Sequence, residues 1–202
     1  MCGKAKSKIS PSKIADIIKS VEEEEENINL SSEGNILNNE PLEKFDNIVP
    51  GMHMYVAYID PITNYLEIEE MQWGFKGYGK GVGGIIFNTR FESIIEKKTF
   101  SNLMEKNRAI VIINGYYENY KIDNKSTKDN YYITNKDEML ILPALYRHQN
   151  YGIKLFTILT KEASSCIKSI HRRQPFILKK NKIISWLNTN KNDKFDAIDL
   201  LI

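Results

Sequence analysis

Residues 108–120 read RAIVIINGYYENY, in which five consecutive apolar residues run into Asn-Gly and then into a tyrosine-rich stretch. Runs rich in β-branched and aromatic residues favour strands, and Asn, Gly and Pro favour the turns between them. Similar runs lie at residues 52–59, 63–75, 129–135, 138–146 and 153–160. Together these runs predict a sheet system of mostly antiparallel strands.

Helical patterns are fewer. Residues 10–27 predict a helix entered through Ser10, Pro11 and Ser12, with four aliphatic side chains at helical spacing between Ile14 and Val21 and a polar end that runs into the glutamates at 22–26. Residues 93–106 and 161–171 are also expected to be helical. Strands and helices do not alternate as βαβ units, so the sequence predicts an α+β, β-dominant class.

Two segments lack any period and are predicted to be loops. Residues 22–40 combine a run of five glutamates with Asn and Ser, which is typical of an exposed acidic and polar loop. Residues 76–84, KGYGKGVGG, match neither of the usual glycine patterns of nucleotide sites and are expected to form a flexible surface loop.

Bulk composition limits the class of protein. At 202 residues, with 42% hydrophobic and 27% charged residues, the chain fits a single domain over residues 1–202. No apolar run approaches the ~18 residues of a membrane span, and the start lacks a signal peptide, so we expect an intracellular protein.

Charge and metal-binding residue types narrow the class further. The two cysteines and the histidines at 53, 148 and 171 have no zinc spacing, so no metal or other cofactor is predicted. Residues 41–202 hold 23 Lys and Arg against 18 acids, and this mildly basic part allows a nucleic-acid partner.

Cys2 directly follows the initiator methionine. If Met1 is removed, Cys2 carries a thiol and a free α-amine on adjacent carbons, and this 1,2-aminothiol condenses with aldehydes to a thiazolidine ring. The amine titrates near about 8 and the thiol near about 8.5, so both are partly available at neutral pH. The alternative is that Cys2 belongs to a frayed terminus without a function.

Three further stretches carry side chains suited to chemistry. Asn88 and Arg90 alternate on one side of a predicted strand and suit a phosphate, or they belong to an ordinary edge strand. Glu118 follows an apolar run and two tyrosines and suits acid–base work, or it faces solvent. His171 ends a predicted helix and can exchange protons, or it caps that helix.

The order and spacing of these stretches resemble the SRAP family, the SOS-response-associated peptidase domain of abasic-site processing proteins. The matching motifs are MCGK at the start, NIVPG at 47–51, WGF at 73–75, NTRFE at 88–92, GYYE at 115–118, LTKEA at 159–163 and HRRQP at 171–175. The resemblance covers nearly the whole chain, although residues 10–40 and the glycine-rich loop match poorly.

Several positions depart from the family pattern. Lys4 replaces the usual Arg, and its ammonium lacks the planar fork with which a guanidinium binds two phosphate oxygens. Asn114 stands for Asp, Asn119 for an aromatic residue, Gln174 for Met, and Arg172 occupies a position where Asp is common. None of these changes removes a predicted catalytic group.

The resemblance implies a barrel-like fold with flanking helices and a sensor of abasic sites in single-stranded DNA. In this interpretation Cys2, after loss of Met1 by autopeptidase activity, forms a covalent thiazolidine crosslink with the sugar aldehyde and shields the lesion. Glu118 transfers protons as the sugar opens and the imine forms. His171 supports imine chemistry and reversal.

The resemblance also implies contacts to the DNA backbone, the first two at the phosphates of the lesion: Asn88, Arg90, Lys4, Thr160 and Arg173. Trp73 has a flat face suited to stacking a base, or it belongs to the core. We expect a monomer that binds single-stranded DNA and no membrane, with replication-fork proteins as candidate partners. The expected compartment is the nucleus in a eukaryote and the cytoplasm in a bacterium.

Two other functions remain open. An N-terminal-nucleophile peptidase would use the same cysteine on a peptide carbonyl, but it needs an oxyanion site that the sequence does not identify. A non-catalytic single-strand DNA module would keep the binding and lack the chemistry.

Overall fold

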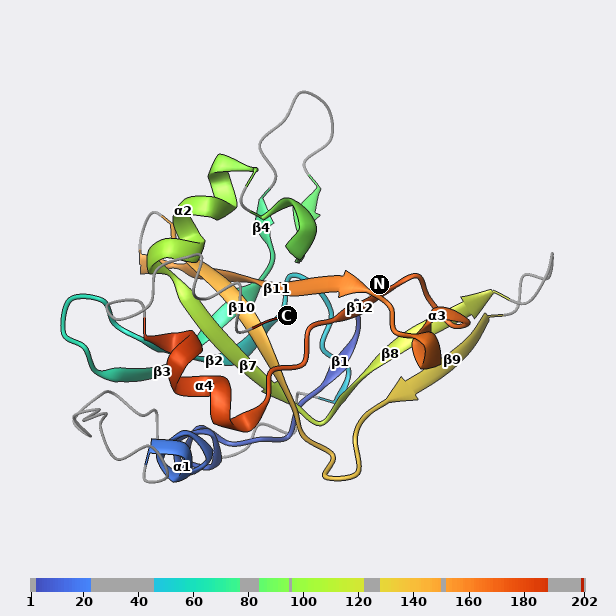
Figure 1. Cartoon of the computed structure of the whole chain (residues 1–202), viewed down its shortest axis with the longest axis horizontal. Helices are drawn as coiled ribbons and strands as arrows, with labels where there is room; N and C mark the ends of the chain where they lie inside the picture. The colour runs from blue at the N-terminus through green and yellow to red at the C-terminus, as the bar shows by residue number, and fades with distance from the viewer. Residues whose placement is uncertain are drawn as a thin grey trace.

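The computed structural model describes residues 3–22, 46–76, 84–94, 96–121, 128–149, 152–188 and 201. Strands dominate this part of the chain, and helices flank them (Figure 1). The predicted β-dominant α+β class is therefore confirmed. No helix in the described ranges is both long enough and apolar enough to cross a membrane.

Five strands close into a ring in the order β10-β7-β2-β3-β11, because β11 also pairs with β10. Most of these pairings are antiparallel, as predicted, whereas β11 runs parallel to β3. Two short strands extend the sheet from β11. The strands are β2 (His53–Ile59), β3 (Leu66–Trp73), β7 (Arg108–Ile113), β10 (Leu140–His148), β11 (Lys154–Glu162), β6 (Asn88–Arg90) and β12 (Arg173–Pro175).

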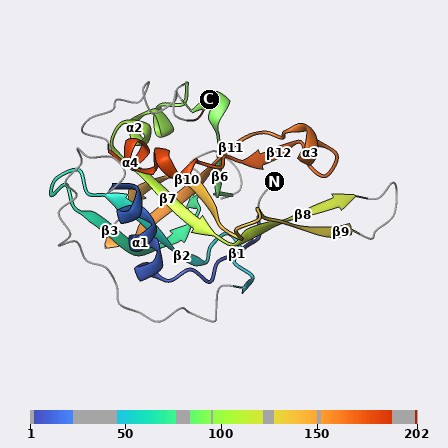
Figure 2. The same cartoon turned by 60° about the horizontal axis from the view of Figure 1, so that its bottom comes forward.

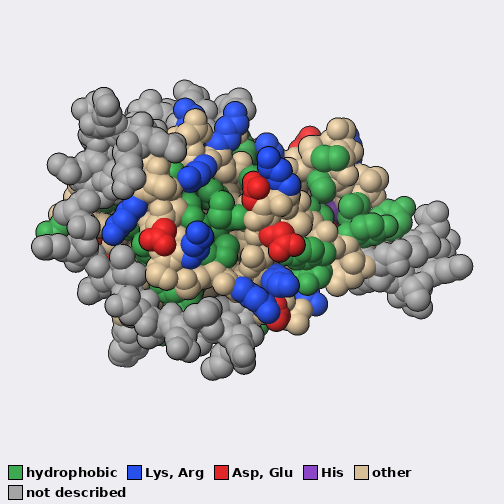
Figure 3. Space-filling view, turned by 90° about the horizontal axis from the view of Figure 1, so that it is seen from below, with side chains coloured by type: hydrophobic (Ala, Val, Ile, Leu, Met, Phe, Trp, Pro, Cys, Tyr) green, Lys and Arg blue, Asp and Glu red, His purple; other side chains and the backbone are tan. Residues whose placement is uncertain are grey.

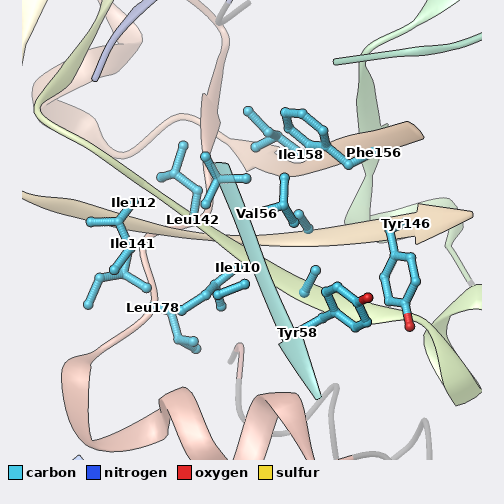
Figure 4. Close-up of a cluster of buried hydrophobic side chains, with 14 of the residues drawn as sticks. Val56, Tyr58, Ile110, Ile112, Ile141, Leu142, Tyr146, Phe156, Ile158 and Leu178 are labelled. Atoms are coloured by element: carbon cyan, nitrogen blue, oxygen red, sulfur yellow. The ribbon is translucent and has the colours of Figure 1, made fainter. Parts of the chain in front are cut away.

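The apolar runs of the sequence are buried on both faces of this sheet, which is why they are continuous rather than alternating. Figure 4 shows Val56, Phe156 and Ile158 gathered on one side, whereas Ile110 and Leu178 lie on the side of a helix. All of these side chains are at most 4% exposed. Burial of each aliphatic side chain contributes about 1.5–3 kcal/mol, so two layers of contacts stabilise the ring.

A second sheet projects from the ring and carries the N-terminal strand at one edge. Its order is β1-β8-β9, and β8 continues from β7 after a single residue, Asn114. The β8–β9 hairpin reaches away from the body, with α3 (Ser165–Lys168) close to it (Figures 1 and 2). The strands are β1 (Ala5–Lys6), β8 (Gly115–Lys121) and β9 (Lys128–Ile133), and a separate small pair is formed by β4 (Phe75–Lys76) and β5 (Ile85–Ile86).

The first predicted helix is confirmed as α1 (Pro11–Glu22). The Ser10 hydroxyl accepts a hydrogen bond from the Lys13 N–H at 3.2 Å, which caps the helix. The four aliphatic side chains between Ile14 and Val21 are buried. The remaining helical turns are α2 (Lys98–Lys106), α3 (Ser165–Lys168), α4 (Ile183–Leu187), η2 (Phe91–Ser93) and η4 (Lys180–Lys182).

Two predicted helices begin later in the structure than the sequence predicts, and the second is also much shorter. The helix expected over 93–106 begins only at Lys98, because the preceding turn η2 is held by tertiary contacts that include Phe91 against Phe176. The helix expected over 161–171 shrinks to α3, because Lys161 and Glu162 pair with β12 and extend β11. Long-range contacts thus override local helical preference at both positions.

Candidate active-site cleft

The N-terminal segment is fixed between two other segments of the chain. Ala5 pairs with Tyr116 of β8, and the Tyr117 N–H donates to the Lys4 carbonyl at 2.8 Å. On its other side, Ala5 exchanges both backbone hydrogen bonds with Ile48, at 2.8 and 2.9 Å. Ala5 is completely buried, so residues 4 and 5 hold a defined position beside β8.

The next residues of this segment are anchored to the β7–β8 junction. Asn114 donates its N–H to the Lys6 carbonyl at 2.8 Å, and its Oδ1 accepts from the Lys8 N–H at 2.7 Å. The Ser7 hydroxyl donates to the Ile112 carbonyl at 3.0 Å. An Asp carboxylate oxygen could accept the same Lys8 hydrogen bond, so the family departure at Asn114 preserves the anchor.

A cleft of about 830 Å³ opens where this segment, β8 and the turn after α3 meet. We call it the N-terminal cleft. Its lining includes Gly3, Lys4, Glu118, Lys168, His171 and Arg172. The structure therefore brings together three residues predicted from the sequence: Lys4, Glu118 and His171.

Glu118 reaches this cleft from the centre of β8. It lies opposite Tyr131 of β9 and is only 4% exposed. The alternative of a solvent-facing glutamate is therefore wrong. A nearly buried carboxyl group at the wall of a cleft is a setting found at functional sites.

The backbone of Arg173 holds the His171 ring in a defined orientation. The Arg173 N–H donates to His171 Nδ1 at 3.0 Å, and the Arg173 carbonyl oxygen lies 3.1 Å from the same nitrogen. A neutral ring accepts the first hydrogen bond and carries its proton on Nε2, whereas a charged ring donates the second. Both protonation states are thus accommodated without a rotation of the ring.

Lys4 lines the same cleft on the side of the N-terminal segment. Its ammonium lies 4.8 Å from the centroid of the Tyr117 ring, a cation–π contact across the β1–β8 pair. The ring of Tyr117 in turn packs against Tyr132 of β9, with centroids 5.0 Å apart. Figure 3 shows hydrophobic side chains gathered at the right of the molecule, over this hairpin.

Asn88 and Arg90 line a second cleft, of about 810 Å³, which we call the β6 cleft. Thr89 between them is buried, whereas Arg90 is exposed, as expected for alternation along a strand. Lys97 and Glu92 lie in the same lining. The residues predicted as one site are therefore divided between two clefts.

The two clefts meet at the start of β12. Arg172 lines the N-terminal cleft, and the adjacent Arg173 lines the β6 cleft. Consecutive Cα atoms are about 3.8 Å apart, so the two walls are neighbours.

Arg173 and Thr160, both predicted to contact the DNA backbone, are held by hydrogen bonds within the protein. The Arg173 guanidinium donates to both carboxylate oxygens of Glu92, at 2.8 and 2.9 Å, and to the Thr160 carbonyl at 2.6 Å. The Thr160 hydroxyl is completely buried and lies 3.3 Å from the Thr89 carbonyl oxygen. Both side chains join β6, β11 and β12 from within, and the buried Thr160 is not accessible to DNA, whereas a phosphate contact of Arg173, which lines the β6 cleft, stays a prediction.

The expectation that Trp73 stacks a base is also wrong for this structure. Trp73 is completely buried, and its Nε1–H donates to the Phe87 carbonyl at 2.8 Å. Its ring lies nearly parallel to Phe156, with centroids 6.4 Å apart. Gly74, next to it, has φ +117°, and a Cβ there would collide with the Ile85 side chain. The WGF motif therefore serves the core.

Among the cleft residues that were not predicted as site residues, two are cationic, Lys168 and Arg172. Lys168 precedes His171 by three residues, so the turn after α3 presents both to one side. That spacing was a usable signal. Arg172 was noted only as a departure from the family pattern.

Cys2 lies outside the described residues, as do residues 23–40 of the predicted acidic loop and residues 77–83 of the glycine-rich loop. Gly3, to which Cys2 is bonded, lines the N-terminal cleft. The assignments of Cys2 and of these loops remain predictions.

Comparison with known proteins identifies relatives of the chain. The abasic site processing protein YoaM of Bacillus subtilis is 27% identical over 163 residues, which are 77% of this chain and 70% of that protein. The abasic site processing protein YMR114C of Saccharomyces cerevisiae is 27% identical over 146 residues, which are 68% of this chain and 39% of that protein.

Solved structures share the fold. A phage-related protein from Bordetella bronchiseptica superimposes with a TM-score of 0.76 at 20% identity, over 99% of this chain and 87% of that one. A Bacteroides thetaiotaomicron protein gives a TM-score of 0.73 at 20% identity, over 99% and 86% of the two chains. The sequence model of one family matches residues 1–202. The chain belongs to the SOS response associated peptidase (SRAP) family.

Proposed function

We propose that this protein senses abasic sites in single-stranded DNA and captures them covalently through Cys2 after removal of Met1. The observation that carries the proposal is the N-terminal cleft, where a nearly buried carboxyl group and an oriented imidazole lie beside Gly3. The family and the names of the relatives, abasic site processing proteins, support the same substrate.

The chemistry needs an aldehyde, which an abasic deoxyribose provides when its ring opens. The α-amine of Cys2 adds to C1′ to give a carbinolamine, which loses water to form an imine. The thiolate of Cys2 then adds to the same carbon, and the nitrogen takes up a proton. The product is a thiazolidine that links protein and sugar.

Glu118 is suited to the proton transfers of the first steps. Ring opening removes a proton from the C1′ hydroxyl and adds one to the ring oxygen. A carboxyl group with little access to water can accept the first proton and return it as the carbinolamine loses water. Its burial on β8 keeps it in place for both steps.

His171 is assigned to the imine and to reversal. In the neutral ring, the hydrogen bond from the Arg173 N–H to Nδ1 leaves the proton on Nε2. In the charged ring, which carries a proton on both nitrogens, Nε2–H can protonate the leaving hydroxyl or, in reversal, the thiazolidine, and the neutral ring remains. The Arg173 carbonyl, 3.1 Å from Nδ1, is available to the charged ring.

Asn88 and Arg90 are assigned to the strand rather than to the reaction. They line the β6 cleft, which adjoins the N-terminal cleft at residues 172 and 173. Phosphate contacts of this kind position a strand without reading its sequence, which suits a lesion that occurs at any base.

The test is denaturing electrophoresis of the purified full chain with single-stranded oligonucleotides. One strand carries an abasic site, a second carries a tetrahydrofuran analogue that cannot form an aldehyde, and a third is intact. We expect a band that survives SDS only with the first strand, and an intact mass that lacks one methionine. Absence of that band from protein lacking Met1 refutes the proposal.

The two cysteines provide a matched pair of variants. Cys166 is exposed on α3, and Cys166→Ala is expected to crosslink like the parent protein. Cys2→Ala keeps an α-amine but has no thiol to close the ring, so its stable band is expected to disappear. A stable band that persists in Cys2→Ala and disappears in Cys166→Ala would identify Cys166 as the nucleophile and contradict the proposal. Turnover of a peptide without attachment to DNA would favour a peptidase instead.

A further inference from the structure

One wall of the N-terminal cleft carries two cations that the reaction does not use. Lys168 and Arg172 both line the cleft and are exposed. Neither side chain forms a hydrogen bond or an ion pair with any other residue that the structure describes. Lys4 lines the same cleft, so its described lining holds three cations and one carboxyl group, that of Glu118.

The backbone beneath this wall is fixed. The Ala163 N–H donates to the Arg172 carbonyl at 3.0 Å, and the His171 N–H donates to the Ile167 carbonyl at 3.0 Å. Lys168 closes the last turn of α3, with its N–H donating to the Ser164 carbonyl at 2.8 Å. Both cations therefore project from a rigid turn that also orients His171.

The adjacent Arg173 gives a direct contrast. Its side chain is 10% exposed, and its guanidinium is held by Glu92 and Thr160. The charge of Arg173 is already paired, whereas that of Arg172 is available to a ligand. Of the two neighbouring arginines, only Arg172 lines the N-terminal cleft, and its guanidinium has no partner among the residues that the structure describes.

We propose that Lys168 and Arg172 form a phosphate-binding wall for the phosphodiester next to the abasic sugar. This inference rests on the function proposed above and assigns two binding residues to the same cleft. A guanidinium can bind two phosphate oxygens at once, and an ammonium adds a second charge. The two cations also offset the repulsion between that phosphate and the buried Glu118 carboxylate.

The test measures binding without reaction. A single-stranded oligonucleotide with the tetrahydrofuran analogue is titrated between about 50 and 200 mM sodium chloride, and log Kd is plotted against log salt. Arg172→Gln and Lys168→Gln are each expected to weaken binding about three- to tenfold and to lower the magnitude of the slope by about 0.7. Arg172→Asp, which reverses the charge, is expected to weaken binding further.

The matched control is Lys179→Gln, which removes an exposed lysine that lines neither cleft. Its slope is expected to equal that of the parent protein.

The phosphate is then identified with oligonucleotides that carry one neutral methylphosphonate on either side of the analogue. One of the two methylphosphonates should weaken binding by the parent protein and leave binding by Arg172→Gln unchanged, because that variant already lacks the contact.

The outcomes separate this inference from the proposed function. A parent protein that crosslinks abasic DNA, with Arg172→Gln and Lys168→Gln slopes equal to the Lys179→Gln slope, overturns the phosphate wall alone. If Arg172→Gln and Lys168→Gln lose the same affinity with every methylphosphonate strand, the phosphate wall is also overturned, because a uniform loss indicates a change in structure rather than a lost contact. A parent protein that forms no SDS-resistant band refutes the proposed function instead.

Discussion

Replacing Arg173 by Met separates an internal role from a contact with DNA. Met has a similar length and fills the space of the aliphatic stem, but it removes every guanidinium hydrogen bond. The Arg173 guanidinium donates to the buried Thr160 carbonyl at 2.6 Å. The variant leaves that carbonyl buried without this donor.

The expected loss follows from the exposure of each partner. A buried carbonyl without a partner costs about 1–3 kcal/mol. The Glu92 side chain is 46% exposed, so water can replace its partner and the lost ion pair adds only about 1 kcal/mol. The total of about 2–4 kcal/mol corresponds to a Tm lower by roughly 4–16 °C for a chain of this length.

The assay combines thermal unfolding with the salt dependence of binding to the tetrahydrofuran strand. We expect Arg173→Met to lower the Tm and to leave the salt slope unchanged. A slope smaller by about 0.7 with an unchanged Tm would refute the reasoning, because it would show that Arg173 contacts a phosphate. Should Arg173→Met not fold, Glu92→Gln removes only the exposed partner and gives the same test in a milder form.

Acid provides an independent check on this ion pair. Burial raises the pKa of Glu92, but the hydrogen bond and charge of Arg173 outweigh it, and the pKa lies below the usual value of 4.5. A lowered pKa means that the pair stabilises the protein fully above about pH 4.5 and is lost as pH falls through the lower, folded value. The difference in stability between the parent and Glu92→Gln should therefore vanish in acid, and a constant difference would contradict the ion pair.

Three further substitutions test the cleft. Glu118→Gln keeps the shape and removes the proton transfer, so crosslink formation should slow roughly 10²-fold while binding to the tetrahydrofuran strand is unchanged; an unaltered rate would remove Glu118 from the reaction. His171→Ala should slow both capture and release, measured by a chase with unlabelled abasic strand; a change in neither rate would contradict its role. Gly115→Ala would place a Cβ 2.6 Å from Tyr132, and we expect a loss of about 1–3 kcal/mol in denaturant unfolding and a slower crosslink; a wild-type midpoint would show that the hairpin adapts.

Much of the ring could be predicted from the sequence, because each strand is long and its apolar residues are continuous. The bounds of the short elements could not be predicted in this way. The predicted helix at residue 161 failed because Glu162 lies opposite Arg173 on β12, a partner that no local pattern reveals. The parallel pairing of β11 with β3 is likewise set by tertiary contacts.

The candidate site was predicted from order and spacing within a family, and the structure refines it. Glu118 and His171 line one cleft, and their catalytic roles stay predictions. Which of two adjacent arginines is buried depends on the side to which each points at the start of β12, and composition carries no such information. Trp73 was misplaced for a similar reason, since an aromatic ring suits a core as well as a groove.

The pairing of β1 with β8 also has a consequence for the order of assembly. The first residues of the chain are synthesised first, yet their partners on β7 and β8 lie more than 100 positions later, as the 105-residue separation between Ser7 and Ile112 shows. Pairing between segments so distant in sequence is slow, because the entropy cost of closing the long loop between them must be met first. A nascent or truncated chain that ends before β8 therefore has an N-terminus without the carboxyl group and imidazole beside it. Reactivity toward aldehydes in the proposed sense would arise only when the whole polypeptide has folded.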